Sequence, residues 1–312
     1  MSKRAQLSDD EGDSDSDSLV DVAFDFLSPN PSVDYQAIKR LLLQLFGRDA
    51  ELFGLHELTE LILSQPYIGS TIKTDGEESD PYALLTVLNM HIHHEHPSMK
   101  ALAQYCLSKS LEASSSSSGA KSLHTTLQAL FSQSENHVGL VICERLINMP
   151  VEVIPPLYNM LKDEMRSANA QGQPFKFTHL LFVSRTYHLS QDEESALANT
   201  LPASEARKKQ GKTKKRRPEE RLGSTNEQGA EGDERPVDGI YSFHAEDALI
   251  SELSLHTLNY TYTTPPPATQ QESRGKDAFG LDTRGRIMLL HLEEERMWDV
   301  LVERMGKIYG AH

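Results

Sequence analysis

The stretch from Val138 to Ala168 constrains the fold of this chain more than any other. It opens with the apolar run VGLVIC at 138–143, which predicts a strand buried on both faces of a sheet. Pro150, Pro155 and Pro156 then precede apolar side chains at helical spacing. Proline suits the first turn of a helix, because its missing N–H would have no intrahelical partner there. A strand joined by a short connection to a packed helix predicts a layered α/β fold.

Apolar periodicity predicts the remaining strands and helices. Alternation at Val20–Phe26 predicts a half-exposed strand, and the apolar stripe of Asp34–Phe46 predicts a helix that stops at Gly47. Further strands are expected at 67–73, 82–91, 175–188, 258–263 and 286–290. Further helices are expected at 55–64, 97–111, 122–131, from 157 onward, at 245–255 and at 293–309. In the last helix, Met297, Val300, Leu301 and Ile308 are expected inside and Trp298 at the edge.

Changes in composition divide the chain into three parts. Residues 1–18 are acidic and of low complexity, so they are expected to form a disordered tail. Residues 190–238 are charged and poor in large apolar residues, which predicts a disordered insert at a loop tip. The flanking residues 19–189 and 239–310 are expected to form a single α/β domain, with the serine run 114–118 as a flexible linker.

The charge balance limits the partners of the chain. It has 31 Lys and Arg against 46 Asp and Glu, a net charge of −15, and the acidic residues recur in the tail and at Asp75–Asp80. An acidic protein suits basic partners, so no direct specific binding to nucleic acid is expected. Cys106 and Cys143 lie in apolar runs and are expected to be small core residues rather than a disulfide. We expect neither a secretory signal nor a membrane span.

One basic run, inside the predicted insert, interrupts this acidic background. Its cations are Arg207, Lys208, Lys209, Lys212, Lys214, Lys215, Arg216 and Arg217. Two basic clusters on a flexible segment predict a nuclear import signal, read by an import carrier with an acidic groove. The alternatives are a contact with nucleic acid or a client, and a solvated charge run without a function. Removing this +8 from the total of −15 leaves the rest of the chain at −23.

The same run overlaps a permissive form of the phosphate-binding loop pattern, from Ala206 to Thr213, with Ala at the position of the first Gly. That loop works because a strand delivers a glycine-rich turn to the N-terminus of a helix. No strand is predicted before this segment and no helix clearly follows it. A nucleotide site is therefore not expected here.

Four histidines, His91, His93, His94 and His96, lie close together beside Glu95. Imidazole is a common ligand of zinc and nickel. Alternation along a strand would nevertheless place the first two on one face and the last two on the other. The favoured interpretation is an exposed cluster at the end of a strand, and the alternative is a metal site.

No arrangement of residues predicts catalysis. The chain has no GxSxG or HExxH motif, and its carboxylates fall mostly on predicted helix surfaces or in tails, so nothing assembles a nucleophile, a base and an oxyanion site. In the tail, Ser8 and Ser14 each have an acidic residue three positions further on, which is typical of acidophilic kinase sites. The alternative is a solubilising tail without regulated phosphorylation.

The pieces YIGSTIK, VGLVICERLINMP and PPLYNMLKDEM, in this order and spacing, resemble the BCCIP family of eukaryotic nuclear proteins in its fungal form. The resemblance implies the fold of the GCN5-related acetyltransferases, a twisted and mostly antiparallel central sheet with helices on both faces. Those enzymes bind acetyl-CoA through a glycine-containing loop between a strand and a helix. The matching junction, Glu144 to Pro156, has no glycine and three prolines, and proline offers no N–H to a phosphate.

The resemblance further implies a binding and escort protein without a cofactor or metal. Fungal members are linked to nuclear export of a phosphatidylinositol phosphate kinase and to chaperoning a large-subunit ribosomal protein. The animal member is named for binding a recombination protein and a cyclin-dependent kinase inhibitor. We therefore expect a non-enzymatic nuclear chaperone or transport factor that shuttles to the cytoplasm and supports ribosome biogenesis. The alternative is a degenerate or active GCN5-like acyltransferase.

Overall fold

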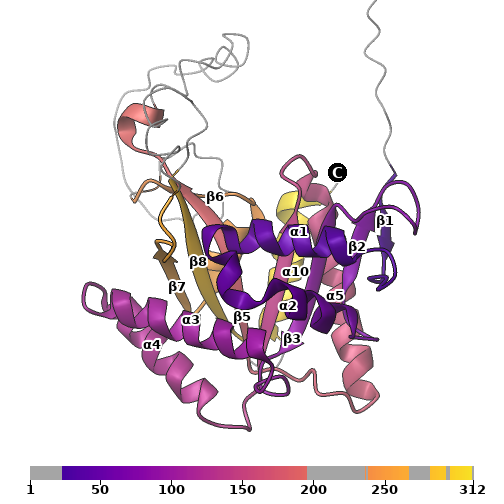
Figure 1. Cartoon of the computed structure of the whole chain (residues 1–312), viewed down its shortest axis with the longest axis horizontal. Coiled ribbons are helices and arrows are strands. Elements are labelled where there is room, and N and C mark those ends of the chain that lie inside the picture. Colours follow the sequence, from indigo (N-terminus) through magenta and orange to yellow (C-terminus); the bar gives the residue numbers. More distant parts are fainter. Residues whose placement is uncertain (1–22, 195–235, 237, 267–281, 293–295, 311–312) are drawn as a thin grey trace, which may run out of the picture.

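A computed structural model describes residues 23–194, 236, 238–266, 282–292 and 296–310. One open sheet runs through these residues, with the strand order β1-β2-β3-β4-β5-β8-β7 and with β6 beside β5 (Figure 1). Each neighbouring pair is antiparallel except β4 and β5, which are parallel. The strands are β1 (Asp25–Leu27), β2 (Ser70–Lys73), β3 (Ala83–Asn89), β4 (Val138–Arg145), β5 (His179–His188), β6 (Ile240–Ser242), β7 (His256–Tyr260) and β8 (Asp282–His291).

Helices cover both faces of the sheet. One face carries α1 (Tyr35–Phe46), the 3₁₀ helix η1 (Gly47–Phe53), α2 (Leu55–Leu63), α3 (Pro97–Ser114) and α4 (Ser118–Phe131). The other face carries the 3₁₀ helix η2 (Val151–Val153), α5 (Ile154–Ala170), α8 (Glu246–Leu253) and α10 (Arg296–Tyr309). In Figure 1, α1, α2 and α3 lie in front of the sheet and α10 lies behind it. Within the described ranges, no helix is both long and apolar enough to span a membrane.

Each central strand contributes to two separate cores, because successive side chains of a strand point to opposite faces. In β3, Leu84 and Leu88 pack against α1 to α4, whereas Ala83, Leu85 and Val87 pack against the helices of the other face. Burial on both sides explains why the sequence shows continuous apolar runs here instead of a polar alternation. The predicted mixed α/β fold with a mostly antiparallel sheet is confirmed.

The parallel pair opens into a wedge toward the carboxyl ends of its strands. Pairing runs from Val138↔His179 to Val141↔Phe182, and no further register joins β4 to β5 in the described residues, although β4 continues to Arg145. β8 pairs with the whole length of β5 on its other side. β6, which pairs with the last three residues of β5, therefore lies in the wedge between β4 and β5.

Local differences from the predicted elements follow from capping and packing. The serine run is a short helix-to-helix turn rather than a linker, because α4 begins at Ser118 and its first turn is capped by the Ser117 hydroxyl, which accepts from the amide of Ala120 at 3.4 Å. β8 is longer than expected at both ends. β6, η1 and η2 were not predicted. Cys106 is fully buried, and Cys143 is only partly buried.

The prediction for the buried face of α10 was right for Leu301 and in part for Met297, but wrong for Val300, Ile308 and Trp298. Trp298 is only 2% exposed and lies in the core with Leu301 and Met305, while Val300 is 39% exposed and Ile308 52% exposed. The large indole is stacked on Tyr158 of α5 with ring centroids 5.7 Å apart. Burial of its area outweighs the smaller aliphatic side chains in setting the orientation of the helix.

Gly139 allows close packing at the start of β4. A Cβ atom at this position would lie 2.8 Å from side-chain carbons of both Val87 and Leu180 and 3.0 Å from a ring carbon of Phe177, all buried. We expect Gly139→Ala to lower the free energy of unfolding by about 1–3 kcal/mol through overpacking. Urea denaturation measures this change.

Gly306→Ala in α10 is the matched control for this substitution. A Cβ atom there would meet nothing within 4 Å, and the position is helical. The control should raise the free energy of unfolding by about 0.5–1 kcal/mol, because alanine favours helix over glycine. Equal effects of the two substitutions would contradict the packing argument.

Candidate functional site

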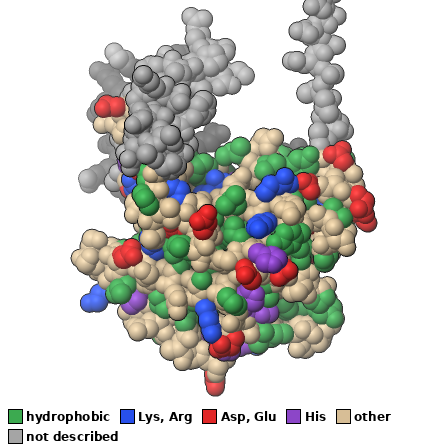
Figure 2. All heavy atoms as spheres, viewed as in Figure 1, with side chains coloured by type: hydrophobic (Ala, Val, Ile, Leu, Met, Phe, Trp, Pro, Cys, Tyr) green, Lys and Arg blue, Asp and Glu red, His purple; other side chains and the backbone are tan. Residues whose placement is uncertain are grey.

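Five exposed carboxylates gather at one corner of the sheet, and we call this set the acidic corner. It consists of Asp25 in β1 and of Asp75, Glu77, Glu78 and Asp80 in the loop between β2 and β3. The pairing Asp25↔Lys73 places the start of this loop beside β1. Figure 2 shows red carboxylates at the upper right, where Figure 1 places β1 and β2.

The basic groups next to the acidic corner leave most of its charge in place. Lys73 is buried, and its ammonium donates to Asp34 Oδ1 and to the carbonyl oxygen of Glu77, both at 2.6 Å. It therefore neutralises the buried Asp34 rather than the corner. At the surface, Arg40 of α1 pairs with Asp80. An exposed ion pair of this kind contributes little free energy and is screened by salt.

The rest of the described surface has the same sign. The described residues include 17 Lys and Arg and 27 Asp and Glu, a formal net charge of −10. Four of these cations and five of these anions are buried. The remaining 13 cations and 22 anions are at least partly exposed. The interior is thus close to neutral, and the acidity of these residues lies on the outside of the fold.

Charged side chains fill the wedge between β4 and β5, and we call them the wedge network. Its members are Glu144, Arg145, Arg185, His244 and Glu246. The Glu144 carboxylate accepts hydrogen bonds from His244 Nε2 at 2.7 Å and from Arg185 Nε at 3.1 Å. It also accepts from Gln44 Nε2 of α1 at 2.8 Å. Beside it, Arg145 donates to both carboxylate oxygens of Glu246, at 3.3 and 2.8 Å.

Glu144 is ionised although its side chain is only 1% exposed. Burial alone would raise the pKa of this carboxyl, but the hydrogen bond from His244 and the charge of Arg185 together hold the pKa below its ordinary value. The carboxylate joins α1, β4, β5 and the segment between β6 and α8. The Glu144 carboxylate therefore has a structural role: it holds these elements together where β4 and β5 separate.

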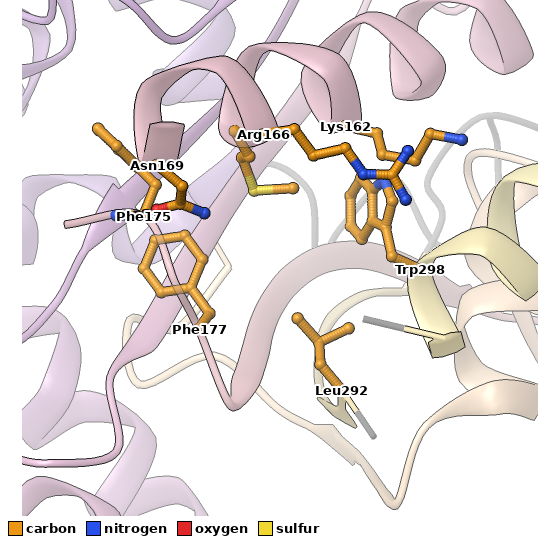
Figure 3. Close-up of a pocket in the computed structure, with 8 residues that line it drawn as sticks. Lys162, Arg166, Asn169, Phe175, Phe177, Leu292 and Trp298 are labelled. Carbon is orange, nitrogen blue, oxygen red and sulfur yellow. Dashed lines mark hydrogen bonds between the residues drawn. The ribbon is translucent and has the colours of Figure 1, made fainter. Parts of the chain in front are cut away.

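A small hollow of about 30 Å³ lies between α5 and α10 (Figure 3). Lys162 and Arg166 of α5 lie above the Trp298 indole, and both pair with Asp299, at 3.3 and 3.2 Å. The Trp298 indole nitrogen has no hydrogen-bond partner among the described residues. The hollow has room for one or two waters. Its lining residues are Lys162, Met165, Arg166, Asn169, Phe175, Phe177, Leu292 and Trp298.

The predicted histidine cluster, His91 to His96, lies in a turn between β3 and α3 and not in a strand. His91 is half-buried: its Nδ1 accepts from the amide of Val138 at 3.1 Å, its Nε2 lies 3.0 Å from the carbonyl oxygen of Leu130, and its ring stacks on His137. Across the described ranges, no group of three or more His, Cys, Asp or Glu could hold a metal ion. His91 thus joins the turn to β4.

Several predicted site residues lie outside the described residues. These are the eight cations of the basic run at 207–217, the overlapping phosphate-loop pattern at 206–213, and the two serines of the tail, Ser8 and Ser14. Their roles stay predictions. The acidic corner and the wedge network, in contrast, bring together residues that are far apart in the sequence.

Comparison with known proteins decides the family. A family model described as BCCIP matches residues 19–250. The chain belongs to the BCCIP family. Among its relatives, protein bcp1 of Schizosaccharomyces pombe is 35% identical over 94% of this chain and 92% of the relative. Protein bcp1 of Aspergillus fumigatus is 38% identical over 91% of this chain and 86% of the relative. The predicted membership is confirmed.

A solved structure supports the fold as well. The crystal structure of BCP1 from Saccharomyces cerevisiae matches with a TM-score of 0.56 and 24% identity, over 98% of this chain and 100% of that one. At this identity the likeness shows the fold alone. The likeness of the BCCIP fold to GCN5-related acetyltransferases, which the sequence resemblance implied, stays a prediction.

The wedge network yields a direct test of its structural role. Glu144→Ala would leave Arg185 and His244 buried without their carboxylate, so we expect the free energy of unfolding to fall by about 3–5 kcal/mol. Asp299→Ala removes an exposed carboxylate and should change it by no more than about 1 kcal/mol. Both are measured by urea denaturation at pH 7, and a loss below 1 kcal/mol for Glu144→Ala would contradict the role.

Proposed function

We propose that this protein is a non-enzymatic escort for basic client proteins, including a large-subunit ribosomal protein, and that its acidic surface holds them. The observation that carries the proposal is the charge distribution, with 22 anions against 13 cations at least partly exposed among the described residues. A free ribosomal protein is basic, because its surface normally faces RNA phosphates. An acidic surface attracts such a client over a long range and blocks its contacts with RNA.

The acidic corner is the proposed centre of the client contact. Its five carboxylates are exposed. Asp80 forms a surface ion pair with Arg40. Leu43 lies three residues after Arg40 on α1 and is 53% exposed, so an exposed apolar side chain neighbours the arginine that pairs with this loop. Carboxylates around an exposed apolar side chain suit a basic partner with some apolar surface.

The alternative is an acyltransferase, degenerate or active, with its cofactor at the junction of β4 and α5. That site would use the opening between the two parallel strands. In this chain β6 and the wedge network occupy the opening, and the junction carries prolines where an acetyltransferase carries glycine. We therefore favour the non-enzymatic function.

The proposed cycle is nuclear. An import carrier would recognise the basic run at 207–217, and the protein would shuttle between nucleus and cytoplasm with its clients. Binding in support of the nuclear export of a phosphatidylinositol phosphate kinase, which the family resemblance implied, belongs to the same proposal. A role in ribosome biogenesis follows if the client is a ribosomal protein.

Neutralising the acidic corner tests the client contact. A variant with Asp75→Asn, Glu77→Gln, Glu78→Gln and Asp80→Asn should weaken binding of a purified basic ribosomal protein at least tenfold, because it removes the carboxylates of the proposed contact. A control variant carries the same loss of charge at four exposed glutamates elsewhere, Glu57, Glu60, Glu112 and Glu135, all to Gln. Affinity and association rate are measured between about 0.05 and 0.5 M salt, over which the Debye length shrinks severalfold.

The two variants separate contact from long-range steering. We expect the control to slow association at low salt but to keep most of the affinity at high salt, whereas the corner variant loses affinity at both. Deleting residues 1–18 should weaken binding only modestly. Binding that does not depend on salt, or that is wholly lost with the tail, would contradict the proposal.

The import prediction needs a separate test. Replacing Lys214, Lys215, Arg216 and Arg217 by alanine should reduce nuclear accumulation, because it removes the second cluster of the predicted signal. Quantitative imaging of the tagged full-length protein measures this. Lys39→Ala together with Lys121→Ala, two lysines of the described fold, serves as the control and should leave nuclear accumulation unchanged. Equal nuclear enrichment of the cluster variant and the unmodified protein would exclude these residues as the signal.

Acetyl-CoA distinguishes the two functional alternatives. A ligand at one hundred times its dissociation constant stabilises a fold by about 2.7 kcal/mol, which shifts the melting temperature by several degrees. We expect no saturable shift with acetyl-CoA up to millimolar concentration, because the opening between β4 and β5 is filled with protein. A saturable shift that is competed by coenzyme A would favour the acyltransferase.

A further inference from the structure

Buried polar atoms without a partner concentrate at one place in this fold. Among the described residues, nine side-chain nitrogen or oxygen atoms are buried without a hydrogen-bond partner. Five of them surround the wedge, and we call them the orphan group: Tyr158 OH, Ser184 Oγ, Thr186 Oγ1, His244 Nδ1 and Asp247 Oδ2. Native proteins leave few such atoms unpaired, and ordered water satisfies many of the exceptions.

The elements of the fold bring most of these atoms to the same face of the sheet. Phe182 of β5 packs in the core formed with α5, α8 and α10. Side chains of a strand alternate, so Ser184 and Thr186 point to the face of Phe182. Tyr158 of α5 is fully buried in that core. Asp247 lies in the first turn of α8, which packs on the same side.

Asp247 is the titratable group of this cluster that has no hydrogen-bonded cation, although His244 and Arg286 lie close enough to act on its pKa in the opposite direction to burial. It is 7% exposed, and burial together with the neighbouring charge of Glu246 raises its pKa to about 7. Arg145 is engaged with Glu246, and Arg286 donates to Asn259 at 2.7 Å and to Ser242 at 2.6 Å. The titratable groups that face this cluster are Cys143, Glu144 and Arg145 from β4, Tyr158 from α5, Arg286 from β8, His244 and Glu246 from the β6–α8 segment, and Tyr309 from α10.

We propose that the orphan group encloses a few buried waters and that a proton held on Asp247 keeps α8 and β6 closed on the sheet. The waters supply the hydrogen bonds that the protein does not, and the neutral carboxylic acid donates one of its own. When Asp247 loses this proton, a negative charge remains in the core beside Glu246 without a cation bonded to it. The burial of that charge favours local opening.

The local opening would release β6 and α8 from the sheet. β6 and α8 are separated by only three residues, and they are held by the bond of His244 to Glu144 and by the bond of Arg286 to Ser242. β6 is the first described strand after residue 194, and it begins two residues after the end of the predicted insert at 238. The wedge is therefore a proton-controlled clasp that holds β6 and α8. This inference does not depend on client binding.

Proton linkage gives the direction and size of the pH dependence of this opening. A carboxyl whose pKa is higher in the closed state favours that state only while it is protonated, so closure weakens as the pH rises. With an ordinary value of 3.8 in the open state and about 7 in the closed state, the opening equilibrium increases about tenfold between pH 6 and pH 8. Above pH 8 it levels off, because Asp247 is then ionised in both states.

Hydrogen exchange of the full-length protein at pH 6, 7 and 8 tests the clasp. Peptides from residues 238–253 are compared with peptides from β3, after correction for the intrinsic pH dependence of exchange. We expect about tenfold loss of protection in 238–253 from pH 6 to pH 8 in the unmodified protein. Asp247→Asn keeps the shape without the charge and should stay protected at all three pH values, whereas Asp299→Asn should behave like the unmodified protein.

Each outcome decides the inference. Protection of 238–253 that is independent of pH in the unmodified protein, or that falls equally in Asp247→Asn, would overturn the proton clasp. If Asp247→Asn does not fold, the comparison of 238–253 with β3 in the unmodified protein decides alone.

A high-resolution crystal structure tests the waters. Water density is expected within hydrogen-bond distance of Tyr158 OH and Thr186 Oγ1, and the absence of water there would refute the hydrated site.

Discussion

The ion network around Glu144 is the interaction on which the rest of this structure depends. Parallel pairing ends after Val141 and Phe182, in the middle of the sheet, and β6 enters the wedge that follows. The carboxylate of Glu144 joins both sides of that wedge to α1 through Gln44. A buried charge is stable only while its partners are present, so the network either holds as a whole or costs several kcal/mol.

The buried charges of the fold nearly cancel, and this determines where its net negative charge lies. The described residues bury nearly equal numbers of cations and anions, as in the pair of Lys73 with Asp34 and that of Arg145 with Glu246. The excess of carboxylates is therefore left on the surface, where water and counter-ions stabilise it. The acidic corner shows this excess where β1, β2 and β3 meet. Such a surface suits the proposed escort of basic clients.

The sequence was informative where a structural signal is local. The run Val138–Cys143 is continuous and apolar, so both its strand and its pairing with the segment ending at His188 could be predicted. Glu144 looked like part of a short connection, because its partners Arg185 and His244 lie 41 and 100 residues away and leave no local pattern. The position of Trp298 was predicted wrongly because a count of apolar positions gives the same value to every side chain. It does not include the large area that one indole ring buries.

Some residues of the candidate site could be predicted from the sequence, and others became evident only in the structure. The acidic loop Asp75–Asp80 was visible in the sequence, whereas Asp25 joined it only through the register of β1 on β2. The orphan group could not be foreseen, since it is defined by hydrogen bonds that the neighbouring residues fail to make. The basic run was the clearest sequence motif, and its role rests on composition alone.

A hydrogen-exchange footprint of the complex with a purified basic ribosomal protein tests most directly whether the acidic corner binds the client. We expect slower exchange on binding in residues 73–82 and along the exposed side of α1, with little change in α10. Protection confined to the hollow between α5 and α10, with residues 73–82 unchanged, would contradict the acidic corner as the client site.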